Sequence, residues 1–126
     1  MQTAWIVDDD EEMIGAVQMM LKLLDYETRP FFSPRPAARA LQSGERPDVL
    51  ILDIRMPEVT GMDFLEFLRH QMQCKDLPIV MLSTEATDVQ VDQALGMGAD
   101  AYVTKPVSIE ELEEALKKAF KAHEKN

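Results

Sequence analysis

The stretch LILDIRMPEVTG, residues 50–61, places a carboxylate directly after a run of apolar residues. The run begins at Val49 and ends at Leu52, and Asp53 is followed closely by Arg55 and Pro57. A short apolar run bounded by polar and turn residues is typical of a buried strand. Asp53 is therefore either an ordinary turn residue at the end of a strand or a reactive group held at the mouth of a rigid sheet.

Four further short apolar runs predict strands, and helical patterns alternate with them. In the helical stretches, apolar residues recur at spacings of three and four, which marks one face of a helix. Ser33 with Pro34 and Ser108 with Glu111 have the sequence of helix starts. The predicted strands are 4–7, 26–32, 49–52, 79–82 and 101–104, and the predicted helices cover 13–24, 37–41, 64–72, about 86–96 and 109–120.

This alternation predicts an α/β fold with a parallel sheet covered by helices on both faces. Right-handed crossovers leave few topologies. We expect a doubly wound, five-stranded, flavodoxin-like (βα)5 fold with strand order 2-1-3-4-5. No linker or repeat divides the chain, so residues 1–126 are expected to form a single domain.

Composition excludes several classes of protein. The chain has 126 residues, of which 46% are apolar, and Cys74 is its only cysteine, so no intrachain disulfide can form. No apolar run approaches the ~18 residues of a membrane span, so we expect a cytoplasmic protein with no membrane partner. The formal charge of −10 repels phosphate backbones and argues against direct nucleic-acid binding.

Candidate site residues follow four of the five predicted strands. Asp8 and Asp9 follow the first strand, Asp53 the third, Ser83 and Thr84 the fourth, and Lys105 the fifth. Each alone has an ordinary explanation as a cap, a turn residue or a solvated charge. In strand order 2-1-3-4-5, however, all of them converge on the carboxyl edge of the sheet, where such folds bind ligands.

The chemistry of this group narrows the ligand. Three carboxylates repel one another unless a cation lies between them. With hard oxygen donors and neither His nor Cys, magnesium is favoured over zinc or copper. A magnesium ion, the Lys105 ammonium and a hydroxyl suit the oxygens of a phosphoryl group, and a carboxylate can itself be the nucleophile that forms an acyl phosphate.

Four separated motifs resemble the receiver domain of two-component response regulators, in particular chemotaxis regulators. They are VDDD (7–10), LDIRMP (52–57), MLSTEA (81–86) and AYVTKP (101–106), in the family's order and spacing. The resemblance implies that Asp53 accepts a phosphoryl group from a sensor histidine kinase or a phosphotransfer protein. It implies a switch that assists its own phosphorylation and dephosphorylation, not an enzyme.

The resemblance also assigns roles to the neighbouring residues. Asp9 would bind magnesium directly and Asp8 often through water, with Asp53 and the backbone carbonyl of Arg55 as further ligands. Lys105 would bind the phosphoryl group, and its bond to Pro106 is typically cis in the family. The resemblance also implies two switch residues. Ser83 would supply the switch hydroxyl, and Tyr102 would be the aromatic residue that turns inward on activation.

Thr84 departs from the family, which usually has alanine or glycine at this position. Threonine is branched and has few rotamers. One hypothesis is that Thr84 narrows access to Asp53 and modulates transfer or hydrolysis. The alternative is that its side chain points away from the site. Thr60 and Val107 also replace common family residues but remove no reacting group.

Two other functions are considered beside the phosphorylation switch. A haloacid-dehalogenase-like phosphatase places an acid two residues after its nucleophile, where this chain has Arg55. A degenerate receiver tends to lose the acids or the lysine, which are all present here. For the switch, a downstream effector or a second copy is expected to bind the face formed by the helix near 86–96, strand 101–104 and helix 109–120. No output domain is expected within the chain.

Overall fold

The computed structural model describes residues 1–124 and contains one five-stranded parallel sheet of order β2-β1-β3-β4-β5. The predicted α/β fold class and strand order are thereby confirmed. The strands are β1 (Gln2–Val7), β2 (Tyr26–Phe31), β3 (Val49–Asp53), β4 (Ile79–Ser83) and β5 (Ala101–Thr104). The helices are α1 (Glu11–Leu23), α2 (Pro34–Gln42), α3 (Gly61–Arg69), α4 (Asp88–Gly96), α5 (Ile109–Ala122) and a 3-10 turn, η1 (Met72–Cys74).

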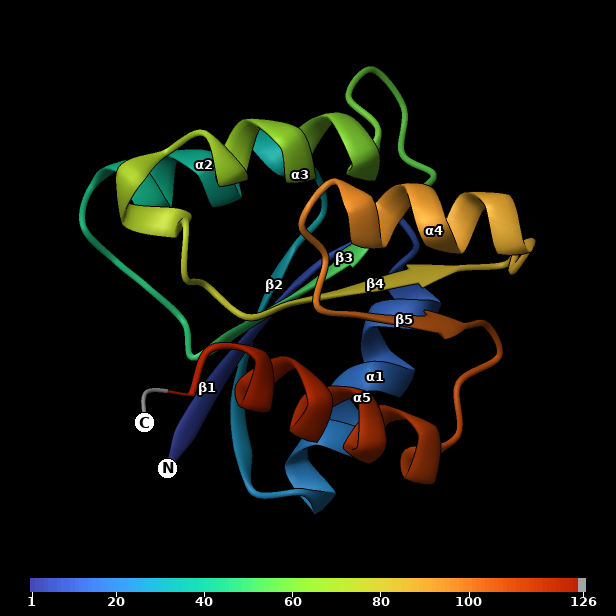
Figure 1. Ribbon diagram of the computed structural model, residues 1–126. Coiled ribbons are helices and arrows are strands. Elements are labelled where there is room, and N and C mark those ends of the chain that lie inside the picture. The colour runs from blue at the N-terminus through green and yellow to red at the C-terminus, as the bar shows by residue number, and fades with distance from the viewer. Residues whose placement is uncertain (125–126) are drawn as a thin grey trace.

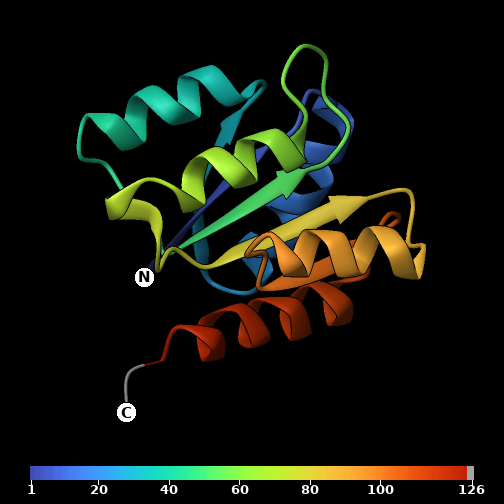
Figure 2. The same ribbon diagram turned by 45° about the horizontal axis from the view of Figure 1, so that its top comes forward.

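The helices form two layers around the sheet. Helices α1 and α5 cover one face, while α2, α3 and α4 lie on the other (Figures 1 and 2). Alternate residues of β3 enter the two cores: Leu50 and Leu52 face the α2–α3 side, and Val49 and Ile51 face the α1–α5 side. Because β3 and β4 are buried on both faces, they read as continuous apolar runs.

Most helices begin at a side-chain cap. Asp10, Thr60, Thr87 and Ser108 each accept a hydrogen bond from a backbone N–H of the first turn. Ser33 stands at the predicted start of α2 but makes no such bond. The predicted start of α4 near residue 86 was two residues early, because Thr87 caps the helix. In the described part of the chain, no helix is both long enough and apolar enough to cross a membrane.

Helix α4 is weakly anchored to the domain. Its only buried residue is Ala94, whereas α5 buries Leu112, Ala115, Leu116 and Ala119. A helix with so little buried apolar surface has a low cost of local displacement. Helix α4 is therefore easier to displace than α5.

Candidate functional site

Three carboxylates meet where β1 and β3 end. Asp53 is the last residue of β3, and Asp8 directly follows β1. Both side chains are buried, whereas Asp9 is exposed. One oxygen from each of the three carboxylates lies within 4.8 Å of the others. The convergence expected from the strand order is therefore present, at the point where the chain winds in opposite directions from β1 and β3.

Lys105 reaches this cluster from the end of β5. Its Nζ lies 2.9 Å from Oδ1 of Asp53 and 3.1 Å from Oδ2 of Asp8, and its side chain is mostly buried. Burial by itself lowers the pKa of Lys105, but the bonds to the two carboxylates outweigh this effect and raise the pKa. Lys105 is therefore held as an ammonium. The Lys105–Pro106 peptide bond is cis, as the resemblance implies.

The electrostatics of Asp53 reflect its buried position. Burial, together with the charge of Asp8, raises the pKa of its carboxyl to about 6, although the hydrogen bond from Lys105 opposes the rise. One ammonium does not neutralise three carboxylates, so the site retains net negative charge.

The donor atoms of the cluster fit a hard divalent cation. All three side chains offer carboxylate oxygens, and neither a histidine nor a cysteine belongs to the group. Magnesium is bound in proteins by a small number of carboxylates together with water, whereas zinc and copper favour nitrogen and sulfur. Asp8, Asp9 and Asp53 are therefore the residues that can hold magnesium at this edge of the sheet.

A small cavity of about 150 Å³ opens onto the cluster. Thr84, Arg55 and Asp10 complete its lining, and Thr84 is exposed there. Ser83 lies deeper: it is buried, and its Oγ accepts a hydrogen bond of 3.0 Å from the backbone N–H of Glu85. Asp10 caps α1, so only the first two residues of the Asp8–Glu12 acidic run belong to the cluster.

Glu85 connects several of these residues and was missed by sequence reasoning. Its carboxylate forms an ion pair with Arg55, which joins the β3–α3 and β4–α4 loops beside the cavity. Its backbone carbonyl accepts a hydrogen bond from the Tyr102 hydroxyl. The available signal was an acidic residue only two positions after Ser83, but nothing in the sequence indicates that it pairs with Arg55.

Gly61 was also missed, and it sets how closely α3 approaches Asp53. Its backbone N–H donates a 2.8 Å hydrogen bond to the carbonyl of Ile54. A Cβ at this position would lie 2.1 Å from the backbone oxygen of Asp53 and 2.7 Å from Cα of Ile54. Only glycine allows this approach without displacing backbone.

Comparison with known proteins places the sequence among signalling domains. The model of the response regulator receiver domain family matches residues 4–117. The uncharacterized transcriptional regulatory protein YcbL of Bacillus subtilis is 33% identical over 116 residues, which cover 92% of this chain and 50% of that protein. Protein RcaC of Microchaete diplosiphon is 31% identical over 85% of this chain. The chain spans about half the length of the first relative and 16% of the second.

Solved structures agree with this result. The chemotaxis protein CheY4 of Vibrio cholerae superimposes with a TM-score of 0.85 at 32% identity, covering 94% of this chain and 98% of that one. A putative response regulator from Chloroflexus aurantiacus gives a TM-score of 0.88 at 28% identity, covering 95% of this chain and 98% of that one.

Proposed function

The chain belongs to the response regulator receiver domain family of two-component signalling, and from this premise we propose that Asp53 is its phosphoacceptor. The observation that carries the proposal is the buried Asp53 carboxylate, held 2.9 Å from Lys105 within the cluster formed with Asp8 and Asp9. Receiver domains are phosphoacceptor switches and not conventional enzymes. The donor in this proposal is the phosphohistidine of a sensor histidine kinase or of a phosphotransfer protein.

In the transfer step, a carboxylate oxygen of Asp53 attacks phosphorus, the P–N bond of the donor breaks, and the imidazole leaves. Lys105 then exchanges its bond with the Asp53 carboxylate for one with a phosphoryl oxygen. The Ser83 hydroxyl donates to a second oxygen. Magnesium bound by Asp8, Asp9, Asp53 and the backbone carbonyl of Arg55 would supply the remaining positive charge.

The proposed switch runs through the loop after β4. In the structure, Ser83 Oγ accepts from the backbone N–H of Glu85, and the Tyr102 hydroxyl donates to the backbone carbonyl of the same residue. If Ser83 turns toward a phosphoryl group, it loses its bond to Glu85. The loop is then free to move, and with it the Glu85 carbonyl that binds Tyr102, whose ring already packs against the core in the structure. Both changes act beside α4, which buries only Ala94.

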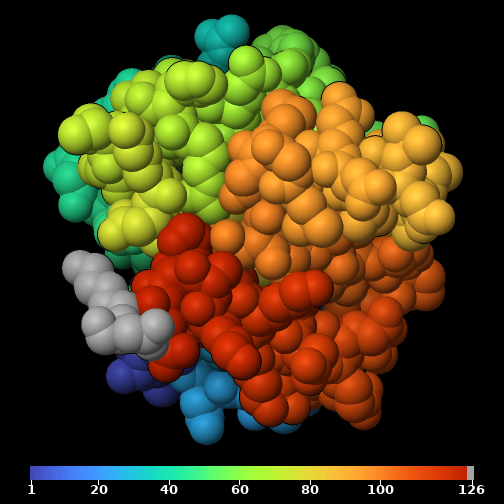
Figure 3. Space-filling view, in the orientation of Figure 1, coloured from blue at the N-terminus to red at the C-terminus, as the bar shows by residue number. Residues whose placement is uncertain are grey.

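The signalling surface in this proposal is the face made by α4, β5 and α5, which binds a downstream effector or a second copy. The surfaces of α4 and α5 adjoin on the side of the molecule shown in Figure 3. The surface combines the exposed Val89 of α4 with the acidic first turn of α5, Glu110 and Glu111. NMR spectra recorded before and after addition of beryllium fluoride should show shifts across α4, β5 and α5. Shifts confined to the acceptor site or to α1 would contradict this surface.

Labelling with acetyl phosphate tests the chemistry. With magnesium, the parent protein should acquire a stable label that Asp53→Asn lacks, and Asp9→Ala should lose metal dependence with most of the activity. Asp25→Asn is the matched control: Asp25 is exposed, and its φ of 68° suits asparagine. Rapid turnover of the label would favour a phosphatase, and absence of label a degenerate receiver. Labelling of Asp53→Asn at the parent rate would refute the assignment.

A further inference from the structure

The two kinds of cationic residue occupy separate parts of the chain. All six arginines lie between residues 29 and 69, and all seven lysines lie outside that range. Residues 28–46, which include most of β2 and all of α2, carry four arginines and a single acid, Glu45. The whole chain has a formal charge of −10, so this segment is a basic stretch within an acidic protein.

Arg35 and Arg39 are the two arginines that no internal contact explains. The other four have partners: Arg29 pairs with Glu45 and stacks on Trp5 and Phe31, Arg46 pairs with Asp76, Arg55 with Glu85, and Arg69 with Asp100. Within residues 1–124, the arginine side chains that form ion pairs or hydrogen bonds are those four, and Arg35 and Arg39 are not among them. Both are exposed, and their spacing of four places them on the same side of α2.

An exposed aromatic side chain accompanies these two arginines. Phe32 precedes α2 and is 51% exposed, although the adjacent Phe31 is buried. Pro36 and Gln42 are also exposed on this helix. We refer to Phe32, Arg35, Pro36, Arg39 and Gln42 as the α2 surface. Helix α2 lies at the rim of the molecule beside the edge strand β2 (Figure 2), apart from the face made by α4, β5 and α5.

Arg35 does not stabilise the helix that carries it. It lies in the first turn of α2, where the helix dipole disfavours a positive charge. The other α-helices have acidic residues in this turn. Arginine and aromatic residues are enriched at the centres of protein interfaces, and lysine is depleted there. The composition of the α2 surface is therefore that of an interface.

We propose that the α2 surface binds an acidic segment of a partner protein. Two carboxylates of that segment pair with Arg35 and Arg39, because guanidinium groups match the geometry of carboxylates. An apolar side chain of the partner covers Phe32. A nucleic acid fits less well, because its continuous phosphate charge would meet the strongly acidic remainder of this protein.

The α2 surface begins at the edge of the sheet that carries the candidate acceptor site. The backbone carbonyl of Phe31 accepts a 3.0 Å hydrogen bond from the N–H of Asp8, which belongs to the carboxylate cluster. Strand β2 is separated from β3 by β1 alone, or about 10 Å between strand axes. A partner seated on the α2 surface therefore approaches the edge of the sheet at which Asp53 lies, two strands away. Binding at the α2 surface does not require Asp53 to be phosphorylated. The proposal for the α2 surface and the proposal that Asp53 is the phosphoacceptor can therefore fail independently.

NMR titration of the unphosphorylated protein with a short synthetic peptide of paired glutamates and leucines tests the proposal. Shifts are expected at Phe32, Arg35 and Arg39, and they should weaken when the salt concentration is raised tenfold. Arg35→Glu with Arg39→Glu should raise the Kd about tenfold or more, since two attractive charge pairs become repulsive. The control Lys22→Glu with Lys75→Glu makes the same change in net charge at exposed sites and should leave the Kd within about twofold.

Two comparison ligands sharpen the outcome. A peptide with lysine in place of glutamate should cause no shifts at the α2 surface. A single-stranded DNA oligonucleotide should bind more weakly than the acidic peptide. The proposal is overturned if the acidic peptide leaves the α2 surface unshifted at millimolar concentration or if both double variants weaken binding equally. If the oligonucleotide binds this surface more tightly than the acidic peptide, the ligand of the α2 surface is a nucleic acid and the proposal of an acidic protein segment is wrong.

Discussion

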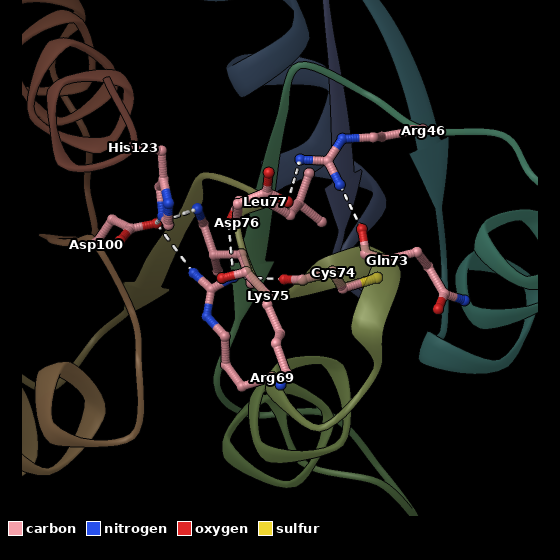
Figure 4. Close-up of polar contacts among 10 residues, drawn as sticks. Arg46, Arg69, Gln73, Cys74, Lys75, Asp76, Leu77, Asp100 and His123 are labelled. Carbon is pink, nitrogen blue, oxygen red and sulfur yellow. Dashed lines mark hydrogen bonds and ion pairs between the residues drawn. The ribbon is translucent and has the colours of Figure 1, made fainter. Parts of the chain in front are cut away.

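Replacing Arg69 by methionine should destabilise the protein by about 3 kcal/mol. Arg69 ends α3, and its guanidinium bridges segments that are far apart in the sequence (Figure 4). Nε donates to the carbonyl of Gly98 at 2.9 Å, and Nη1 donates to the carbonyls of Cys74 and Leu77 at 2.8 and 2.7 Å. Nη2 lies 3.0 Å from Oδ2 of Asp100. One side chain therefore holds the η1 turn, the approach to β4 and the α4–β5 turn together.

The magnitude follows from burial. The side chains of Arg69 and Asp100 are only 13% and 10% exposed. Burial lowers the pKa of Arg69 even though Asp100 opposes this, so the guanidinium is substantially desolvated. Breaking a buried ion pair from one side costs about 3–5 kcal/mol, because the remaining charge is left uncompensated. Asp100 keeps the backbone N–H of Ile79 and Nε2 of His123, both at 2.9 Å, which places the expected loss near the lower limit.

Urea unfolding followed by circular dichroism measures this loss. Arg46→Met is the matched control, because Arg46 and Asp76 form a pair with side chains 40% and 67% exposed. Exposed pairs contribute at most about 1 kcal/mol. Arg69→Met combined with Asp100→Asn should cost less than the sum of the single changes, since the stranded charge is removed. If Arg69→Met costs no more than Arg46→Met, the guanidinium does not hold these segments together.

Three further predictions concern the candidate site. Gly61→Ala should destabilise the protein by about 1–3 kcal/mol and slow labelling of Asp53, because the new Cβ meets backbone atoms. The control is Gly15→Ala on α1, where the new Cβ has nothing within 4 Å and should not destabilise the protein. Equal free energies of unfolding for the two variants would contradict this prediction. In metal-free protein, the carboxyl 13C signal of Asp53 should titrate near pH 6. Because this pKa is raised on folding, the metal-free parent protein should gain stability relative to Asp53→Asn as the pH falls from 7 toward 5. A titration midpoint of the Asp53 signal near pH 4 would contradict both the raised pKa and this gain in stability. Thr84→Ala should speed labelling by small donors and shorten the lifetime of the label, since Thr84 lines the cavity; if both rates match the parent while the fold is intact, Thr84 has no role in access.

Much of the architecture was predictable from local pattern. Apolar runs such as 49–52, alternating with helical spacing, are enough to indicate a parallel sheet, and the rules for crossovers then leave few strand orders. Once the order is known, Asp8, Asp9, Asp53, Ser83 and Lys105 must share one edge, because the carboxyl ends of parallel strands coincide. The fold and the convergence of the acids therefore follow from the sequence alone.

Tertiary structure decided which atoms meet. The acidic run Asp8–Glu12 looks uniform in the sequence, yet Asp8 and Asp9 join the cluster while Asp10 caps α1, because the chain turns at that point. The pairing of Glu85 with Arg55 depends on how two loops lie against each other, and the closeness of Gly61 to Asp53 depends on how the β3–α3 loop folds back. The apolar pattern of a helix or strand indicates which of its own residues face the core. Contacts between side chains of different elements depend on packing distances and rotamers, which a linear pattern does not contain.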